Sequence, residues 1–365
     1  MMIKKRIILV AGARPNFMKI APIYREMKNH LDDFEPILVH TGQHYDTNMS
    51  DMFFRDLELP APDVYLGIGS GSHAEQTAGV MLEFEKVCLT NAPDLVIVVG
   101  DVNSTMACAI AAVKLNIPVV HVEAGLRSGD RSMPEEINRL ITDSISDLLF
   151  TPSVDADENL LKEGCAAERI YRVGNIMVDS LEFIRPKVEY ANTCDRLGII
   201  PKTYGLVTLH RPSNVDIKKT IEQIVIIFRK VSESIRIIFP VHPRTRKKLE
   251  TFKLLAALDD NAGITLLNPL GYIDFMNLMM NTKFVITDSG GIQEETTYLG
   301  IPCLTLRPNT ERPITITEGT NELVTLDNLE FKMMDAYRGR WKRGRIPELW
   351  DGMTAVRIVG IIRNL

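Results

Sequence analysis

The stretch DLVIVVGDVNSTMACAIAAVKLNIPVVHVEAGLR, residues 94–127, decides the fold. It opens with a nearly continuous apolar run, Asp94–Gly100, passes through a helix-like segment and includes a second run, Pro118–Val122. Short continuous runs rich in valine and isoleucine are typical of strands buried on both faces of a parallel sheet. Two such strands joined by a helix form a βαβ unit, which indicates a doubly wound α/β architecture.

The same alternation of apolar run and helix-like segment recurs along the chain in two series. The series divide near residues 173–176, and a new strand opens at Tyr204. At roughly 150 residues per domain, the length of 365 residues also predicts two domains. We therefore expect an α/β protein with two Rossmann-like domains, residues 1–174 and 175–350, a ligand cleft between them, and a terminal helix over residues 351–365. The other runs behind this prediction are Ile7–Ala11, Pro36–His40, Leu148–Thr151, Ile170–Val173, Gly205–Leu209, Ile235–Val241, Ile264–Leu267, Phe284–Thr287 and Cys303–Leu306.

The composition excludes several classes of protein. Apolar residues make up 45% and charged residues 24%, which is ordinary for a soluble globular protein. A net charge of −5 argues against nucleic acid as a main partner, because such proteins usually carry a basic field. No apolar run approaches the ~18–20 residues of a membrane span, and the one after Met1–Arg6 is too short for a signal peptide. The five scattered cysteines suit reduced thiols in a cytoplasm better than disulfides or a zinc site.

The first strand ends at a turn that suits an anion. Gly12-Ala13-Arg14-Pro15 enters a helix, and Lys19 follows five residues after Arg14. Free N–H groups at the helix start, together with these two cations, would bind a phosphate or diphosphate. The alternative is an ordinary turn with solvated cations. The dinucleotide fingerprint G-x-G-x-x-G is absent, so no nicotinamide or flavin cofactor is expected.

Acidic residues follow two further strands. Asp101 either caps the next helix or points a carboxylate into the cleft. Glu123 comes directly after a buried strand, where a carboxylate needs a partner, so we expect it to be paired, functional or both. Glu135 and Arg139 lie four residues apart on one helix face, either as a surface ion pair or as functional groups.

In the second half, His210-Arg211 and His242-Pro243-Arg244 each follow a strand, and this repeated placement favours anion binding. No histidine spacing matches a motif such as H-E-x-x-H, so no metal is expected. Ser289-Gly290-Gly291 leads from a strand into a helix, where glycines let the backbone approach a nucleotide diphosphate. Glu295, one turn into that helix, would accept hydrogen bonds from ribose hydroxyls, and Arg312 lies beyond the last strand.

Taken together, these motifs resemble the non-hydrolysing UDP-N-acetylglucosamine 2-epimerase family over essentially the whole chain. The resemblance implies a glycosyltransferase-B fold, in which the C-terminal helix returns to the first domain, and a homodimer. Its most specific strings are His121-Val122-Glu123-Ala124-Gly125-Leu126-Arg127, Pro134-Glu135-Glu136-Ile137-Asn138-Arg139, Thr287-Asp288-Ser289-Gly290-Gly291-Ile292-Gln293-Glu294-Glu295 and Thr310-Glu311-Arg312-Pro313.

The resemblance also implies roles for matching positions. Asp101, Glu123 and Glu135 match the family's acid/base carboxylates, and Arg139 and His210 match its catalytic cations. Further positions match substrate-binding residues, which are Arg14, Lys19, His242, Phe275, Ser289, Gly290, Gly291, Glu295 and Arg312.

The implied reaction is reversible epimerisation at carbon 2 of UDP-N-acetylglucosamine to UDP-N-acetylmannosamine. No carbonyl acidifies the hydrogen on carbon 2, so the route is elimination of UDP to a 2-acetamidoglucal. Re-addition of UDP with protonation from the opposite face gives the epimer. This needs a general base, a general acid and cations on the departing diphosphate. The sequence leaves open which carboxylate acts as base and which as acid.

The chain departs from the family at an effector site for a UDP-sugar. Arg211-Pro212 stands where many bacterial members have Arg-Arg, and residues 69–75 replace a stretch that carries an Arg-Gln pair. A glutamine near the uracil site is replaced by Leu270. These departures weaken the prediction of allosteric activation and leave that of catalysis intact. Other effector positions are still matched by Gln43, Glu136, Arg211 and His242.

Four alternatives stay open. A relative acting on another UDP-sugar, such as a 2,3-diacetamido uronic acid, would share the core motifs. A hydrolysing epimerase, which releases free N-acetylmannosamine, has a different string at residues 123–127. A glycosyltransferase on the same scaffold would need an acceptor site, since fold alone does not decide function. A non-catalytic nucleotide-sugar binder would have no need of three acids near a diphosphate.

Overall fold

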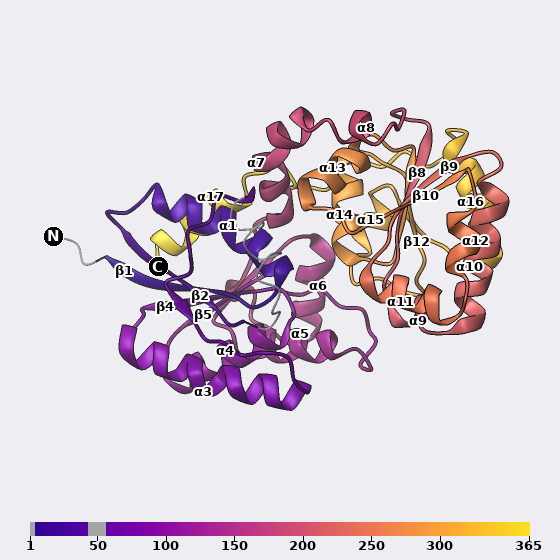
Figure 1. Cartoon of the computed structure of the whole chain (residues 1–365). Helices are drawn as coiled ribbons and strands as arrows, with labels where there is room; N and C mark the ends of the chain where they lie inside the picture. Colours follow the sequence, from indigo (N-terminus) through magenta and orange to yellow (C-terminus); the bar gives the residue numbers. More distant parts are fainter. Residues whose placement is uncertain (1–3, 43–55) are drawn as a thin grey trace. The chain divides into compact units, whose positions relative to one another are not determined.

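The computed structural model describes residues 4–42 and 56–365 of the chain. Contacts divide it into unit 1, Met1–Ile184 with Glu348–Leu365, and unit 2, Arg185–Pro347. Each unit is built on a parallel sheet with helices on both faces (Figure 1), which confirms the α/β class. The sequence predicts domain limits after residues 174 and 350. These limits stay a prediction, because a division by contacts does not test which segments fold independently. In the described part of the chain, no helix has both the length and the apolar character of a bilayer span.

The sheet of unit 1 has the strand order β3-β2-β1-β4-β5-β6-β7. The last five residues of β1 (Lys5–Ala11) and all five of β4 (Leu95–Val99) are buried. Burial on both faces explains why these strands read as continuous apolar runs. β1 pairs in parallel with β2 on one side and with β4 on the other. The remaining strands are β2 (Phe34–His40), β3 (Val64–Tyr65), β5 (Val119–Val122), β6 (Leu148–Thr151) and β7 (Ile170–Arg172).

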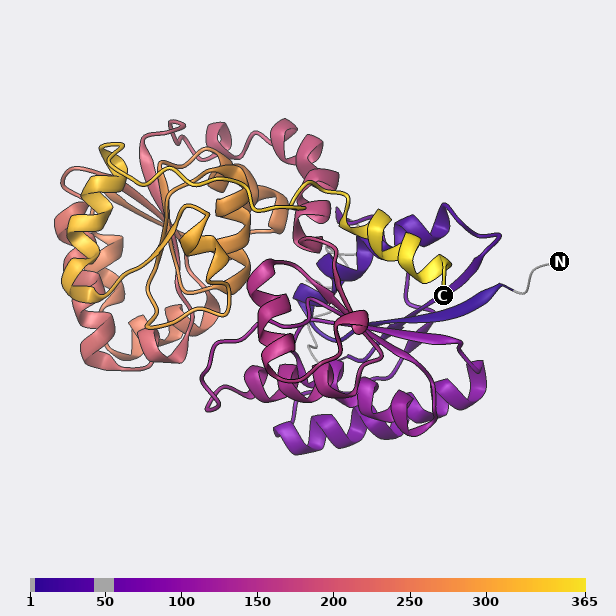
Figure 2. The same cartoon turned by 180° about the vertical axis from the view of Figure 1, so that it is seen from behind.

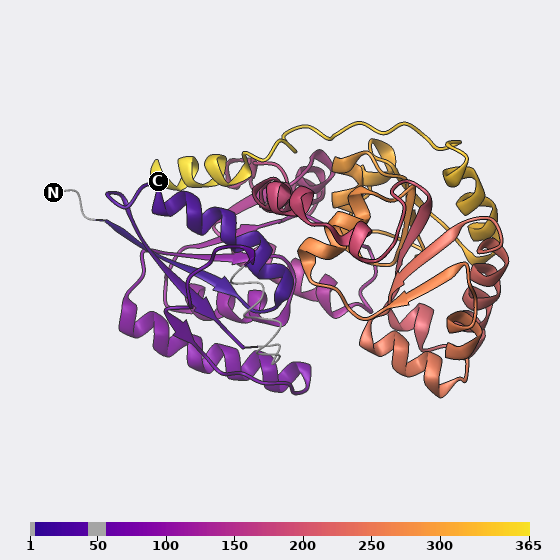
Figure 3. The same ribbon diagram turned by 45° about the horizontal axis from the view of Figure 1, so that its top comes forward.

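Helices cover both faces of this sheet. Small residues such as Ala107 and Ala111 let α4 pack closely against Ile8 and Val96 of the two central strands. Figures 1 and 3 show α1 on the opposite face from α3 and α4. The bounds are α1 (Arg14–Lys28), α3 (His73–Asn91), α4 (Asn103–Lys114), α5 (Pro134–Ile145), α6 (Val154–Lys162) and the short 3-10 helix Ala167–Arg169.

The C-terminal helix α17 (Thr354–Arg363) packs beside α1 (Figure 2). Asp179 of α7 (Ile176–Tyr190) accepts a 2.7 Å hydrogen bond from the backbone N–H of Ala355. The indole N–H of Trp350 donates to the backbone carbonyl of Pro152 at 2.9 Å. These contacts tie the end of the chain to elements more than 170 residues earlier.

Unit 2 has the strand order β10-β9-β8-β11-β12-β13. A Cβ on Gly205 of β8 would lie 2.4 Å from the Phe284 ring of β11, so only glycine fits beside it. Phe228 of α10 (Lys218–Val231) and Phe239 of β9 meet edge to face on one side of the sheet. The strands are β8 (Tyr204–Thr208), β9 (Arg236–Pro240), β10 (Ile264–Leu267), β11 (Phe284–Thr287), β12 (Cys303–Thr305) and β13 (Asn321–Leu323).

In Figure 1, α10, α12 and α16 lie on one side of the unit 2 sheet, and α13, α14 and α15 lie on the other. This arrangement makes unit 2 doubly wound, as unit 1 is. Its helices are α8 (Thr193–Arg196), α9 (Pro212–Val215), α10 (Lys218–Val231), α11 (Pro243–Thr251), α12 (Leu255–Asp259), α13 (Tyr272–Met280), α14 (Gly290–Leu299), α15 (Ile314–Thr317) and α16 (Leu326–Tyr337).

Both sheets reverse their winding direction between two central strands. In unit 1 the reversal lies between β1 and β4, and in unit 2 it lies between β8 and β11. Ligands of open α/β sheets bind outside the carboxyl ends of the strands at such a switch point. The residues that follow these four strands are therefore the first candidates for a site.

Candidate active site

Unit 1 carries a buried ion pair at the carboxyl edge of its sheet. The ammonium group of Lys19 in α1 contacts Oε2 of Glu123, the residue that follows β5. Both residues are buried, with 6% and 7% of their surface exposed. A buried charge without a partner is strongly destabilising, so each of these groups depends on the other. The expectation that Glu123 is paired is confirmed.

The backbone around this pair adopts unusual conformations. Gly100, which follows β4, has a φ of +67°, and a Cβ there would lie 2.6 Å from Nζ of Lys19. Glycine therefore lets this turn pass close to the ion pair. Glu123 itself has a φ of +72°, in the left-handed region that few non-glycine residues adopt. Strain of this kind costs on the order of 1–3 kcal/mol and is found mainly at functional sites.

Arg139 in α5 contacts two carboxylates. Its buried guanidinium group reaches Oδ2 of Asp101 and Oε2 of Glu136. Glu136 also accepts hydrogen bonds from the backbone N–H groups of Ser128 at 3.0 Å and Gly129 at 2.9 Å. Burial raises the pKa of Glu136, but these hydrogen bonds and Arg139 outweigh it and hold the pKa below its usual range. An ionised Glu136 thus fixes Arg139 beside Asp101.

Two of the alternatives that the sequence left open are wrong. The N-cap of α4 is Val102, and no side-chain hydrogen bond caps this helix. Asp101 is therefore not the cap, and its carboxylate pairs with Arg139 instead. Glu135 and Arg139 do not form a surface pair, because Arg139 is buried against other carboxylates while Glu135 is exposed.

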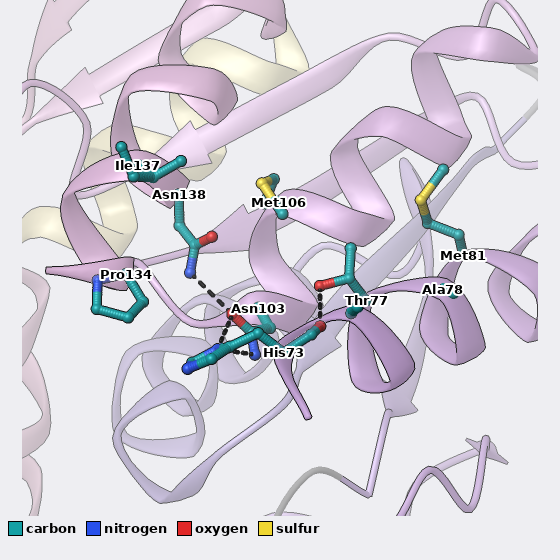
Figure 4. A pocket seen from close by; sticks show the side chains of 10 residues that line it. His73, Thr77, Ala78, Met81, Asn103, Met106, Pro134, Ile137 and Asn138 are labelled. Atoms are coloured by element: carbon teal, nitrogen blue, oxygen red, sulfur yellow. Dashed lines mark hydrogen bonds between the residues drawn. The ribbon is translucent and has the colours of Figure 1, made fainter. Parts of the chain in front are cut away.

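A pocket of about 440 Å³ lies beside this group, lined by residues from the N-terminal parts of α3, α4 and α5. Figure 4 shows Asn138 pointing toward Asn103, which lies against His73. Asn138 also donates to the backbone carbonyl of Asp101 at 2.8 Å. The lining of the pocket includes neither Asp101 nor Glu123, so the pocket borders the carboxylates and does not contain them.

Unit 2 carries a histidine–aspartate pair where β8 and β11 end. Asp288 is fully buried and accepts hydrogen bonds from the backbone N–H groups of His210 and Arg211 and from the amide of Asn214. Nδ1 of His210 lies 3.0 Å from Oδ1 of Asp288. Burial raises the pKa of Asp288, but the bonds from His210 and its neighbours hold it below its usual range. An ionised Asp288 places a hydrogen on Nδ1 of the half-buried His210 ring, and its Nε2 is then the nitrogen left for a ligand.

Two adjacent glycines form the turn after β11, and their surroundings differ. A Cβ on Gly290 would lie 2.5 Å from Nη1 of Arg312 and 2.7 Å from Oε1 of Glu311, whereas a Cβ on Gly291 would meet nothing within 4 Å. The turn opens α14, whose first turn holds no acidic residue. Gly290 is therefore required by the protein itself, and Gly291 leaves open space above a helix N-terminus that suits an anion.

Arg312 belongs to a buried network beneath this turn. It pairs with Glu294 at 3.0 Å and with Glu311 at 2.6 Å, and Glu311 also accepts from Arg307 at 2.7 Å. Burial raises the pKa of Glu311, but the two arginines outweigh it and hold the pKa far below its usual range. The network fixes the position of the Gly290–Gly291 turn, because Gly290 lies directly against Arg312.

Glu295 lies in α14 with 4% of its surface exposed. Its Oε1 accepts a 2.6 Å hydrogen bond from the hydroxyl of Tyr272, the first residue of α13. Phe275, in the same helix as Tyr272, is partly buried. The hydroxyl of Tyr272 holds the carboxylate in place from a neighbouring helix.

The remaining predicted residues are placed as follows. Arg14 is the first residue of α1, and Gln43 lies outside the described residues. Arg211 donates through Nε to the backbone carbonyl of Asp288 at 2.9 Å. The His242 ring lies 5.3 Å from that of His210 and accepts from the N–H of Arg244, which caps α11.

Sequence reasoning did not single out Asp288 and Tyr272, which hold the predicted site residues His210 and Glu295 in place. Asp288 directly follows a buried strand, as Glu123 does, and that position was the signal that would have found it. Tyr272 carries no such signal, because it meets Glu295 only through the packing of two helices. Within residues 4–42 and 56–365, no three His, Cys, Asp or Glu side chains come together as metal ligands.

Comparison with known proteins gives one consistent result. The sequence profile of the UDP-N-acetylglucosamine 2-epimerase family matches residues 25–363. A UDP-N-acetylglucosamine 2-epimerase homolog from Methanococcus maripaludis is 45% identical, over 99% of this chain and 100% of that protein. A UDP-2,3-diacetamido-2,3-dideoxy-D-glucuronate 2-epimerase from Pseudomonas aeruginosa is 39% identical, over 87% of this chain and 88% of that protein.

Solved structures agree with these relatives. The crystal structure of the Methanocaldococcus jannaschii UDP-GlcNAc 2-epimerase, in complex with UDP-GlcNAc and UDP, has a TM-score of 0.88 and 41% identity over 99% of this chain and 100% of that one. A lipopolysaccharide galactosyltransferase has a TM-score of 0.54 at 12% identity, over 99% of this chain and 100% of that one, which shows likeness of fold alone. The chain belongs to the UDP-N-acetylglucosamine 2-epimerase family.

Proposed function

We propose that this protein interconverts UDP-N-acetylglucosamine and UDP-N-acetylmannosamine by eliminating and re-adding UDP. The observation that carries the proposal is the pairing of two carboxylates with buried cations at one sheet edge. Glu123 pairs with Lys19, and Asp101 pairs with Arg139. A protein that only bound a diphosphate would gain nothing from acids in these positions. Membership of the family supplies the substrate class.

Elimination begins at carbon 2 of the sugar. A carboxylate takes the proton from carbon 2 while the bond from carbon 1 to the β-phosphate oxygen breaks. The electron pair of the C–H bond becomes the double bond of a 2-acetamidoglucal, and UDP leaves with the electron pair of the broken C–O bond. On return, an acid protonates carbon 2 from the opposite face and the UDP oxygen attaches again to carbon 1. Asp101, Glu123 and Glu135 are the proposed acid and base groups, and such groups contribute about 10²–10⁴-fold each.

The departing UDP needs positive charge and hydrogen-bond donors around its phosphates. In the proposal, the N–H groups of the Ser289-Gly290-Gly291 turn and the cations Arg14, Lys19, Arg139 and His210 supply them. The remaining binding roles are held by Glu295 on the ribose and by Phe275, His242 and Arg312 on the rest of the nucleotide.

A second substrate is favoured by a specific observation. The relative from Pseudomonas aeruginosa, 39% identical, is named for a UDP-2,3-diacetamido uronic acid. The same elimination would run on that sugar, because the chemistry involves only carbons 1 and 2. Incubating the protein with each UDP-sugar separately and following the anomeric signals by NMR distinguishes the two. Conversion of UDP-N-acetylglucosamine supports the main proposal; conversion of the uronic acid alone supports the second and overturns the first.

The proposal includes a cellular setting. We place the protein in the cytoplasm, where its five free thiols stay reduced, and we expect a homodimer from the family resemblance. Light scattering on purified protein tests the dimer. Whether Gln43, Glu136 and Arg211 serve a UDP-sugar effector is tested by the dependence of the rate on substrate concentration, which an activating effector makes sigmoidal.

A further inference from the structure

His121 lies beneath the candidate site, where three elements of unit 1 meet. It is the third residue of β5 and is fully buried. Its Nδ1 lies 2.6 Å from Oδ1 of Asp143 in α5. Its Nε2 lies 2.8 Å from the backbone carbonyl of Gly100, in the turn after β4. One side chain therefore connects β5, α5 and the β4 turn.

Each of these elements delivers a group of the proposed machinery. Glu123 follows β5 two residues after His121, the β4 turn continues directly into Asp101, and α5 carries Arg139. The N–H of Gly100 also donates to the backbone carbonyl of Val122 at 3.0 Å. The β4 turn is thus held on one side by β5 backbone and on the other by the His121 ring.

Both ring nitrogens of His121 face acceptors. A backbone carbonyl can accept a hydrogen bond but cannot donate one. Burial raises the pKa of Asp143, but His121 and Arg127 hold it below its usual range, so this carboxylate is ionised and also accepts only. Asp143 is itself held by the N–H of Gly125 at 3.1 Å and by Nη1 of Arg127 at 2.7 Å. Nε2 must therefore carry a hydrogen to bond the Gly100 carbonyl, and the 2.6 Å contact between Nδ1 and Asp143 holds the ring from its other side.

We propose that His121 is a positioning residue of the epimerase reaction: through its two ring contacts it ties the Gly100 turn to α5 and so sets Asp101 against Arg139. This inference rests on the proposed function. His121 does not touch the substrate in this account. Its effect is on the placement of Asp101, and a shift of about 1 Å in a catalytic group can cost on the order of 100-fold in rate.

Two substitutions separate the two bonds of the ring. His121→Asn keeps a donor near the position of Nδ1 and loses the bond to Gly100, whereas His121→Gln keeps a donor near Nε2 and loses the bond to Asp143. Since the Gly100 bond is the one that reaches the turn, the Asn variant should lose more activity. We expect kcat to fall by about 10–100-fold in the Asn variant and less in the Gln variant, with KM unchanged.

Asp147→Asn is the matched control. Asp147 accepts a 2.8 Å hydrogen bond from the N–H of Val119 at the opposite end of the same strand. The Asp147→Asn variant should have a lower unfolding temperature than the wild type and the same kcat. If both His121 variants keep the wild-type kcat, or if kcat follows the loss of stability in all three variants, the positioning role is overturned.

Nitrogen-15 NMR of histidine-labelled protein tests the bond to Gly100 apart from activity. The inference predicts that Nε2 of His121 carries a hydrogen bonded to the Gly100 carbonyl, and a bare Nε2 would overturn it. This readout also serves if a variant fails to fold. Wild-type protein that does not convert UDP-N-acetylglucosamine would contradict the proposed function, whereas active wild-type protein with unaffected His121 variants would contradict this inference alone.

Discussion

Glu123 and Lys19 form a buried ion pair although 104 residues separate them in the sequence. The carboxylate comes from the end of β5, and the ammonium group comes from the second turn of α1. Only the parallel sheet brings them together, because both β1, which leads into α1, and β5 end at the same edge. We therefore expect stability and the proposed catalysis to depend on the same contact.

Removing one partner of this pair should be strongly destabilising. Lys19→Met removes the cation that pairs with the buried carboxylate of Glu123, and we expect the free energy of unfolding to fall by about 3–5 kcal/mol. A double variant, Lys19→Met with Glu123→Leu, should recover most of the loss, since it buries no charge. Urea unfolding measures both.

The exposed pair of Lys86 and Glu83, at 2.7 Å in α3, is the control. Lys86→Met should change stability by less than about 0.5 kcal/mol, because an exposed pair contributes little. Equal free energies of unfolding for the Lys19 and Lys86 variants would show that the buried pair does not contribute the predicted ~3–5 kcal/mol to stability.

Loss of either acid at the sheet edge should abolish most turnover while UDP still binds. Asp101→Asn and Glu123→Gln each remove a proton carrier and keep the shape of the side chain. We expect kcat to fall by about 10²–10⁴-fold, with the Kd for UDP from calorimetry close to that of the wild type. Glu158→Gln, at an exposed pair on α6, is the control. Near-normal kcat in both acid variants would mean that the roles are misassigned.

The strand ends were predictable because parallel strands all end at one edge, so Asp101 and Glu123 could be placed from the apolar runs alone. Their partners could not be placed in this way. Arg139 lies 38 residues after Asp101 and reaches it through the packing of α5. Local spacing instead offered Glu135 as its partner, and that pairing does not occur.

Two of the four edge strands in the described part of the chain, β3 and β13, were also beyond the sequence pattern, whereas β7 and β10 match the predicted runs Ile170–Val173 and Ile264–Leu267. β3 has two residues and β13 has three, Asn-Glu-Leu, so neither presents a continuous apolar run. A strand at the sheet edge is less buried than a central one, and the signal that identified β4 is then missing. The buried network of Arg307, Glu311 and Arg312 likewise depends on tertiary packing, which no periodicity reports.

The two glycines after β11 should respond differently to the same substitution. Gly290→Ala places a methyl group 2.5 Å from Arg312, so it should lower both stability and UDP affinity. Gly291→Ala meets no protein atom within 4 Å, so it should leave stability unchanged and weaken UDP binding alone. Thermal unfolding measures the stability of the two variants, and calorimetry measures their affinity for UDP. Unchanged UDP affinity in the Gly291 variant would place the diphosphate elsewhere.

Glu311 should make unit 2 sensitive to acid. Its pKa is lowered in the folded protein below the usual value of 4.5, so the unfolded chain binds its proton first as the pH falls. The stability from its ionised form is complete above that value and is lost as the pH falls through the lower folded pKa. The stability gap between wild type and Glu311→Gln should therefore be widest at pH 7 and narrow below about pH 4.5. A gap that stays constant from pH 7 to pH 3 in urea unfolding would contradict this assignment.

The central claim is that the carbon 2 proton leaves the sugar during each turnover. The direct measurement is to incubate the protein with UDP-N-acetylglucosamine in deuterium oxide and to examine the first UDP-N-acetylmannosamine formed by proton NMR and mass spectrometry. The account predicts deuterium at carbon 2 in essentially every product molecule, because protonation from the opposite face uses an acid that exchanges with solvent. UDP-N-acetylmannosamine that keeps its original hydrogen at carbon 2 would contradict it.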